Sequence, residues 1–254
     1  MIAGCPALTD PQWQVIADLF DCRRRRRVSL RQVFDGLRYI VRSGCQWRCL
    51  PDSYPPWQTV AYYFYQWQRR GLIQQASLRL NRLDRQREGR QAEPSLLSVD
   101  SQSVPAGPRV KEERGLDAAK KVNGRKRHIL VDISGRIWAV LVTSASAHDG
   151  VSALRLIPLL PLSRLILILG DAAYGGAFRA AVEAAGIRVE IASRPPSEKG
   201  FVPIKKRWVV ERTFAWTRFY RKLIHDSAYS TTSHEAWVMM MNICLCLNRL
   251  TNSS

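Results

Sequence analysis

The stretch LILILGDAAYGG, residues 165–176, decides the fold class. Its first five residues are apolar on both faces of an extended chain, which is typical of a central strand covered by helices on both sides. Asp171 follows where this strand ends, and a glycine-containing turn comes next. Ligands of open α/β sheets bind at the carboxyl ends of such strands. The stretch therefore predicts an α/β fold with Asp171 at its functional edge, although a turn-capping aspartate is an alternative interpretation.

Further apolar runs separated by turn residues surround this central strand. They predict strands over residues 96–99, 128–133, 137–143, 165–169 and 189–192, with a tight turn at 132–135. Apolar residues at helical spacing predict helices over 151–160 and 178–185 and a long helix from about residue 206. The order β-β-β-α-β-α-β predicts a five-stranded mixed sheet with flanking helices, closed by the long helix.

The first part of the chain has helical periodicity instead. Three helices are predicted, at about residues 10–20, 30–43 and 57–69. The polar and charged segment 83–94 is interpreted as a domain boundary. The sequence thus predicts a small all-α, helix-turn-helix-like domain over residues 1–91, followed by the α/β domain over residues 92–254.

The charge balance predicts a polyanionic partner. The chain has 39 Lys and Arg against 21 Asp and Glu, a formal net charge of +18. Nucleic acid is the commonest soluble polyanion, so DNA or RNA binding is the expectation. The sequence offers neither a secretion signal nor an apolar run long enough to cross a bilayer. We therefore expect a cytoplasmic protein that does not enter a membrane.

Asp100 ends the first predicted strand, which should lie beside the strand that leads to Asp171. Two neighbouring carboxylates raise each other's pKa unless a cation neutralises them. Such a pair implies either a shared proton or a bound metal.

Glu211 lies in the segment RWVVERTFAWTRFYRK, residues 207–222. On a helix, Arg207, Glu211, Arg218 and Lys222 form one stripe, so one acid stands in a line of bases. An ordinary surface pair between Arg207 and Glu211 is one interpretation. The other is a metal ligand flanked by cations that hold phosphates.

Several sequence blocks resemble those of bacterial transposases of the insertion-sequence four and five superfamily, and the chain looks insertion-sequence-five-like. In the N-terminal part these blocks are LTDPQW (8–13), GCQWRCLP (44–51) and WQTV (57–60). In the C-terminal part they are SVDSQSV (98–104), GRKRH (124–128), GDAAY (170–174) and RWVVER (207–212). The resemblance covers nearly the whole chain.

This resemblance implies a ribonuclease H-like catalytic domain with a DDE triad formed by Asp100, Asp171 and Glu211. It implies that the triad binds Mg²⁺, with Mn²⁺ as a substitute, and that terminal inverted repeats and target DNA are the substrates. A homodimer on paired DNA ends in the bacterial nucleoid is expected from the family as well. Ile204 and Arg218 depart from the superfamily pattern, which has Tyr and Lys at those places.

DNA contacts are predicted in two regions. Basic side chains flanking the second strand are interpreted as phosphate contacts, with a solvated, charged sheet edge as the alternative: Lys120, Lys121, Arg125, Lys126 and Arg127. Sequence readout is assigned to the third helix, with these candidates: Tyr63, Gln66, Gln68 and Arg69. Trp57, Phe64 and Trp67 on the same helix are interpreted as core residues.

Two further acids have structural interpretations. Asp132 is predicted to shape the turn between the second and third strands, and Asp149 to cap the helix that begins at Gly150, with a place in the triad as its alternative. Two other functions fit the same residues: a nuclease or resolvase that cuts without joining, and an inactive copy that regulates by binding DNA. The intact triad argues against inactivity.

Overall fold

A computed structural model describes residues 6–20, 27–108, 110, 112–160, 163–192 and 208–251. Its helices are α1 (Asp10–Gln14), α2 (Leu30–Ser43), α3 (Trp57–Arg69), α4 (Leu72–Arg87), α5 (Asp149–Ala153), α6 (Ala177–Ala184), α7 (Trp208–Thr217) and α8 (Thr231–Thr251). Its strands are β1 (Leu96–Pro105), β2 (Gly115–Asp117), β3 (Val122–Val131), β4 (Ile137–Ser144), β5 (Leu167–Gly170) and β6 (Arg188–Ile191). Short 3-10 turns are η1 (Ala17–Phe20), η2 (Trp47–Cys49), η3 (Leu154–Leu159), η4 (Ala172–Tyr174) and η5 (Arg221–Leu223).

The strands form one mixed sheet in which β1 is central. β1 pairs antiparallel with β3 and parallel with β5, and β6 extends the sheet beyond β5 in parallel. β4 and the short β2 both pair with β3. This arrangement confirms the ribonuclease H-like fold and the five predicted strands. The sixth strand, β2, was not predicted because three residues are too few for a visible alternation of polar and apolar side chains.

β1 is longer than predicted, so Asp100 lies in its middle and not at its end. The pairing with β3 continues from Ser98 opposite Val131 to Pro105 opposite Gly124. A side chain at Gly124 could not be accommodated, because its Cβ would lie 2.0 Å from the Val104 carbonyl oxygen. Glycine therefore lets the two backbones stay paired six residues beyond the predicted strand.

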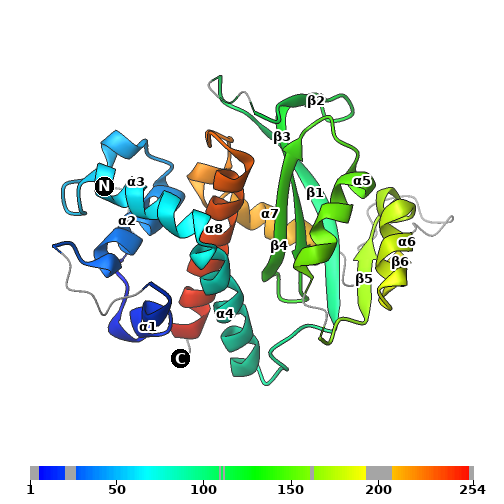
Figure 1. Cartoon of the computed structure of the whole chain (residues 1–254), viewed down its shortest axis with the longest axis horizontal. Coiled ribbons are helices and arrows are strands. Elements are labelled where there is room, and N and C mark those ends of the chain that lie inside the picture. The colour runs from blue at the N-terminus through cyan, green and yellow to red at the C-terminus, as the bar shows by residue number, and fades with distance from the viewer. Residues whose placement is uncertain are drawn as a thin grey trace.

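Helices cover both faces of the sheet, and two apolar cores result (Figure 1). On one face, α5 and α6 pack over Leu97, Trp138 and Ile168. On the other, Ile129 and Val140 belong to a core that includes α7, α8 and the N-terminal helices. The boundary at residues 91 and 92 stays a prediction, since this second core continues across it.

α8 stands between the N-terminal helices and the sheet (Figure 1). It packs against α2, α3, α4 and β4, and its buried residues include Met240, Met241 and Leu247. It spans 21 residues, yet across the described ranges no helix is both long enough and apolar enough to cross a membrane. α8 is thus the shared centre of the helical region.

The first part of the polar segment 83–94 is helical, because α4 continues through it to Arg87. Asp84 is buried and its Oδ2 lies 2.7 Å from Arg136 Nε. Asp132 accepts hydrogen bonds from the backbone nitrogens of Ser134 (2.9 Å) and Arg136 (3.1 Å), which confirms its predicted role in the turn. Charges that looked solvated therefore face one another inside the protein.

The prediction of one long C-terminal helix is wrong. α7 ends at Thr217 and α8 begins at Thr231. Asp226 fixes the connection between them: its carbonyl oxygen accepts from Gly107 N at 2.8 Å, and its carboxylate pairs with Arg125 and His234, both at 3.0 Å. These bonds hold the connection against the end of β1. Lys222 consequently does not share a helical stripe with Glu211.

Candidate active site

β1 and β5 bring two carboxylates to the same level of the sheet. Ser98 of β1 pairs with Leu169 of β5 in parallel register. Continuing this register by two residues would place Asp100 level with Asp171, which directly follows the last residue of β5. Side chains two residues apart point to the same side of a strand, so Asp100 lies on the face set by Ser98.

Both carboxylates are half-buried and anchored to backbone. Asp171 Oδ1 accepts from Ala173 N at 3.0 Å, which makes Asp171 the N-cap of η4. Asp100 Oδ1 accepts from Ser101 N at 2.7 Å. The capping role that was the alternative for Asp171 is thus real. It leaves the predicted catalytic role open, because a cap needs one of the two carboxylate oxygens.

Tyr174 identifies the centre of the acidic region. Burial raises the pKa of its hydroxyl, and the negative charges of Asp100, Asp149 and Asp171 raise it further. Its ring is fully buried and meets Phe178 edge-on at 5.5 Å. Three acids therefore act on one buried phenol, and the third of them, Asp149, was not part of the predicted triad.

The predicted capping role of Asp149 is wrong. His148 is the N-cap of α5, and Asp149 is its first helical residue. Its Oδ1 lies 2.9 Å from Lys126 Nζ, so the carboxylate forms an ion pair. Gly150 permits the close packing that brings α5 here, because a Cβ at this position would lie 2.2 Å from Ala173 O. Gly150, directly after Asp149, was the feature of the sequence that could have indicated this close packing.

Glu211 lies on the exposed side of α7, a helix that packs against β1 and β3. Next to it, the Arg212 guanidinium lies between Trp208 and Trp216, 4.4 Å and 4.7 Å from their ring centroids. Arg207 is outside the described residues, so its predicted pair with Glu211 is not described. Within the described ranges, three metal-binding side chains do not come close enough to form a cluster. The sheet aligns Asp100 and Asp171, while Glu211 sits on a neighbouring helix.

The donor chemistry of the aligned acids fits a hard divalent cation. Carboxylate oxygens are the donors that Mg²⁺ and Mn²⁺ prefer in proteins. The chemistry of Asp100 and Asp171 thus matches the predicted cofactor.

The prediction that Arg125, Lys126 and Arg127 contact phosphates is wrong, and so is its alternative of a solvated edge. Their side chains are 1%, 7% and 3% exposed. Arg125 pairs with Asp226, and Lys126 with Asp149. Arg127 donates to Thr217 Oγ1 at 2.8 Å and to the Leu223 carbonyl oxygen at 3.1 Å. These cations hold α5, α7 and the α7–α8 connection to β3.

The remaining basic candidates are accessible. Lys120 and Lys121 are exposed in the turn between β2 and β3. Asp117 shapes this turn, accepting from Lys120 N at 3.0 Å and from Ser103 Oγ at 2.5 Å. The turn is thereby tied to β1 three residues beyond Asp100. Arg69 and Arg218 are also exposed.

The helix predicted to read the DNA sequence is α3, and some of its side chains stabilise the fold. Phe64 and Trp67 are buried, which confirms them as core residues, whereas Trp57 is half-buried. Gln68 donates from Nε2 to Thr232 Oγ1 at 2.8 Å, so its amide also contacts α8, and its role in DNA readout stays a prediction. Tyr63 is half-buried with its ring 5.5 Å from that of Trp67.

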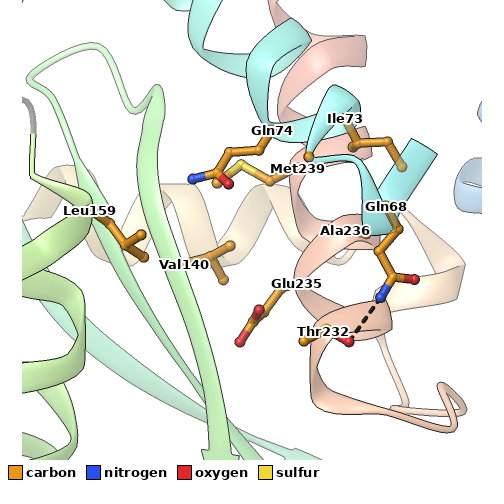
Figure 2. A pocket seen from close by; sticks show the side chains of 10 residues that line it. Gln68, Ile73, Gln74, Val140, Leu159, Thr232, Glu235, Ala236 and Met239 are labelled. Carbon is orange, nitrogen blue, oxygen red and sulfur yellow. Dashed lines mark hydrogen bonds between the residues drawn. The ribbon is translucent and has the colours of Figure 1, made fainter. Parts of the chain in front are cut away.

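A separate cavity of about 300 Å³ lies beside β4, two strands away from the aligned acids. Figure 2 shows Glu235 of α8 in this cavity together with Val140, Leu159 and Met239. Glu235 Oε1 accepts from Val142 N at 2.8 Å, and burial raises its pKa to about 7. Its carboxylate therefore covers an outer backbone N–H of the edge strand.

The order of the strands and the helices on both faces of the sheet define a ribonuclease H-like protein. Residues 91–248 match the family "Transposase DDE domain", and the chain belongs to this family. Residues 8–77 match a second family, described as "Putative transposase of IS4/5 family". The insertion-sequence four and five resemblance is thereby confirmed.

Two curated relatives are similar to parts of the chain. One is the "Putative transposase for insertion sequence element IS402" of Burkholderia cepacia, 32% identical over 137 residues, or 50% of this chain and 64% of the relative. The other is an uncharacterized protein of Sinorhizobium fredii, y4sN, 28% identical over 106 residues, or 40% of this chain and 78% of the relative. The chain thus spans less than two thirds of the length of the Burkholderia relative.

Proposed function

We propose that this chain is a DNA transposase that binds the ends of its insertion sequence, cleaves them hydrolytically and joins the freed 3′-OH ends to target DNA. The observation that carries the proposal is the parallel pairing of β1, which contains Asp100, with β5, which leads directly to Asp171. Membership of the transposase family supports it.

In this proposal Asp100, Asp171 and Glu211 hold Mg²⁺ or Mn²⁺. Bound divalent cations supply charge stabilisation for the attacking and leaving oxygens of an in-line displacement at phosphorus. The residues of the chain contribute by orienting the carboxylates that hold the cations. The backbone hydrogen bonds of Asp100 and Asp171 orient the two carboxylates before substrate arrives.

The DNA backbone is held in this proposal by the exposed cations Lys120, Lys121, Arg218 and Arg69, with Arg207 and Lys222 as further candidates. Lys120 and Lys121 stand near the strand that carries Asp100. Phosphate contacts of this kind position DNA without reading its sequence. A homodimer on paired ends is part of the same proposal.

A strand-transfer assay with labelled element ends and Mg²⁺ or Mn²⁺ tests the function. Wild type is compared with Asp100→Ala, Asp171→Ala and Glu211→Ala. Glu190→Ala is the matched control, because Glu190 is an exposed acid on β6, opposite Leu169. We expect cleavage and joining by wild type and Glu190→Ala, and loss of both in the other three.

The alternatives give different results in the same assay. Cutting without joining identifies a nuclease or resolvase, and binding without cutting identifies a DNA-binding regulator. Full activity of Glu211→Ala removes Glu211 from the triad and turns attention to Asp149, whose charge already acts at Tyr174.

A further inference from the structure

A cavity of about 720 Å³ lies between the N-terminal helical region and the end of β1, and we call it the interface pocket. Its walls include Trp47 and Arg48 of η2, Trp57 at the start of α3, Pro108 beyond β1, and Lys222 of η5. The volume is within the range of roughly 300–1,000 Å³ that is usual for ligand pockets. Segments far apart in sequence thus enclose one site.

Two cations, Arg48 and Lys222, line the interface pocket. In the described part of the chain, no carboxylate lies within ion-pair distance of Arg48 or Lys222. The nearby Asp226 is already engaged by Arg125 and His234. By contrast, the buried Arg125 and Arg136 both have acidic partners. The pocket therefore has a surplus of positive charge that an anionic group would balance.

Lys222 is held in place by a hydroxyl group and an aromatic ring. Its Nζ donates to Ser227 Oγ at 2.9 Å and lies 5.7 Å from the ring centroid of Trp237. Burial lowers the pKa of Lys222, while the charge of Asp226 raises it. A desolvated ammonium in this position gains more from a phosphate than an exposed lysine does.

The other walls are aromatic and half-exposed. Trp47 is fixed by Phe64 and Trp237, whose ring centroids are 5.8 Å and 5.7 Å away. Trp57 lies under the Arg48 guanidinium at 5.8 Å. Rigid indoles beside cations suit a ligand that combines a flat ring with an anionic group.

We propose that the interface pocket binds one unpaired nucleotide of a DNA strand, with its base against the indoles and its phosphate between Arg48 and Lys222. The base must be turned out of its duplex, because a paired base does not present a free face to an indole. The proposal rests on the proposed function in taking DNA as the ligand.

The position of the pocket suits a strand that also passes the acids. Gly107, which lines the pocket, lies two residues past the end of β1, and Asp100 lies on the same strand. At about 3.3 Å per residue, the five steps from Asp100 to Pro105 span about 16 Å. A few nucleotides of an extended strand bridge such a distance.

The test uses the full chain and DNA that contains one 2-aminopurine, whose fluorescence falls when it stacks on an indole. Three probes are titrated: a short single strand, the same sequence as a duplex, and free 2-aminopurine deoxynucleoside monophosphate. We expect the single strand to be quenched and bound more tightly than the free nucleotide, because neighbouring phosphates add contacts.

Variants then locate the binding. Trp57→Ala should weaken single-strand binding by about fivefold or more, the loss expected for one stacked base. Arg48→Gln and Lys222→Gln should each lower the salt dependence by about one phosphate contact. Arg179→Gln is the charge-matched control, because Arg179 is an exposed arginine on α6. Arg48 is exposed, so its variant tests the site even if Trp57→Ala unfolds.

Three results overturn the inference: an unquenched single strand, wild-type binding by both Arg48→Gln and Lys222→Gln, or equally tight binding of the free nucleotide. If duplex is still bound and transferred in these cases, only the pocket inference fails. If the variants weaken single-strand binding but wild type transfers no strands, the pocket inference stands and the proposed function fails.

Discussion

The carboxylate of Asp132 and the guanidinium of Arg85 lie 2.7 Å apart inside the protein, and this pair joins α4 to the turn between β3 and β4. Arg136 pairs with the same carboxylate at 3.2 Å and with Asp84 at 2.7 Å. All four side chains are buried. The helical region and the sheet are therefore connected by a network of buried ion pairs as well as by apolar packing.

Asp132→Ala should lower the free energy of unfolding by about 3–5 kcal/mol, because it leaves the buried Arg85 guanidinium without its carboxylate partner and removes one of the acids that pair with Arg136. It also removes the acceptor for two backbone N–H groups of the turn. Urea denaturation measures the loss. Asp18→Ala, which removes an exposed pair with Arg79, should change little. Equal losses in the two variants would contradict this account.

Asp171→Asn should raise the melting temperature of the metal-free protein. Its amide oxygen still accepts from Ala173 N, while one of the three negative charges near Tyr174 disappears. Mg²⁺ should then stabilise wild type more than the variant, since a ligand stabilises the state that binds it. Thermal shift with and without Mg²⁺ measures both effects, with Glu190→Gln as the control. Identical Mg²⁺ shifts in all three proteins argue against a metal at this site.

Lys120 and Lys121 should affect DNA binding but not folding. Replacing both with Ala should weaken binding and lower the salt dependence by about two phosphate contacts. Both side chains are exposed, so the melting temperature should not change. Arg125→Ala should instead lower the free energy of unfolding by about 3–5 kcal/mol, because it breaks a buried ion pair with Asp226. An unchanged salt dependence of DNA binding in the double variant would show that these lysines do not contact DNA phosphates.

Glu235 should make stability depend on pH. Burial raises its pKa from 4.5 to about 7, so folding favours its neutral form. Its contribution is complete below about pH 4.5 and is lost as the pH rises to about 7. Glu235→Gln keeps an acceptor for Val142 N but does not titrate. Its melting temperature should therefore exceed that of wild type by more at about pH 8 than at about pH 5.

Melting curves of wild type and Glu235→Gln across this range are the measurement. Glu190→Gln is the control, because Glu190 is exposed on β6. A difference between Glu235→Gln and wild type that stays constant with pH would show that the carboxylate titrates normally.

The sheet could be predicted because its signal is local. The apolar run 165–169 identifies an interior strand from five adjacent residues, and Asp171 follows from the same pattern. The alignment with Asp100 follows once two such strands are taken as parallel neighbours. The full length of β1 could not be seen, because its second half is polar and owes its pairing to Gly124 on another strand.

The burial of charged residues could not be predicted, because it depends on partners distant in sequence. Arg125 looks like a surface cation until Asp226 is placed beside it, and α4 looks like a linker until Arg136 meets Asp84. The interface pocket could not be predicted for the same reason. Arg48 and Lys222 are 174 positions apart, and only the fold brings them to one cavity.

The central place of α8 has a consequence for how the protein is made. The helices that pack around it are synthesised first, and the ribosome must then complete the whole sheet before α8 emerges. Until then, the apolar faces of α2, α3 and α4 lack the surface that covers them. A translation product that stops short of Thr231 should therefore stay incompletely folded and be cleared by proteolysis.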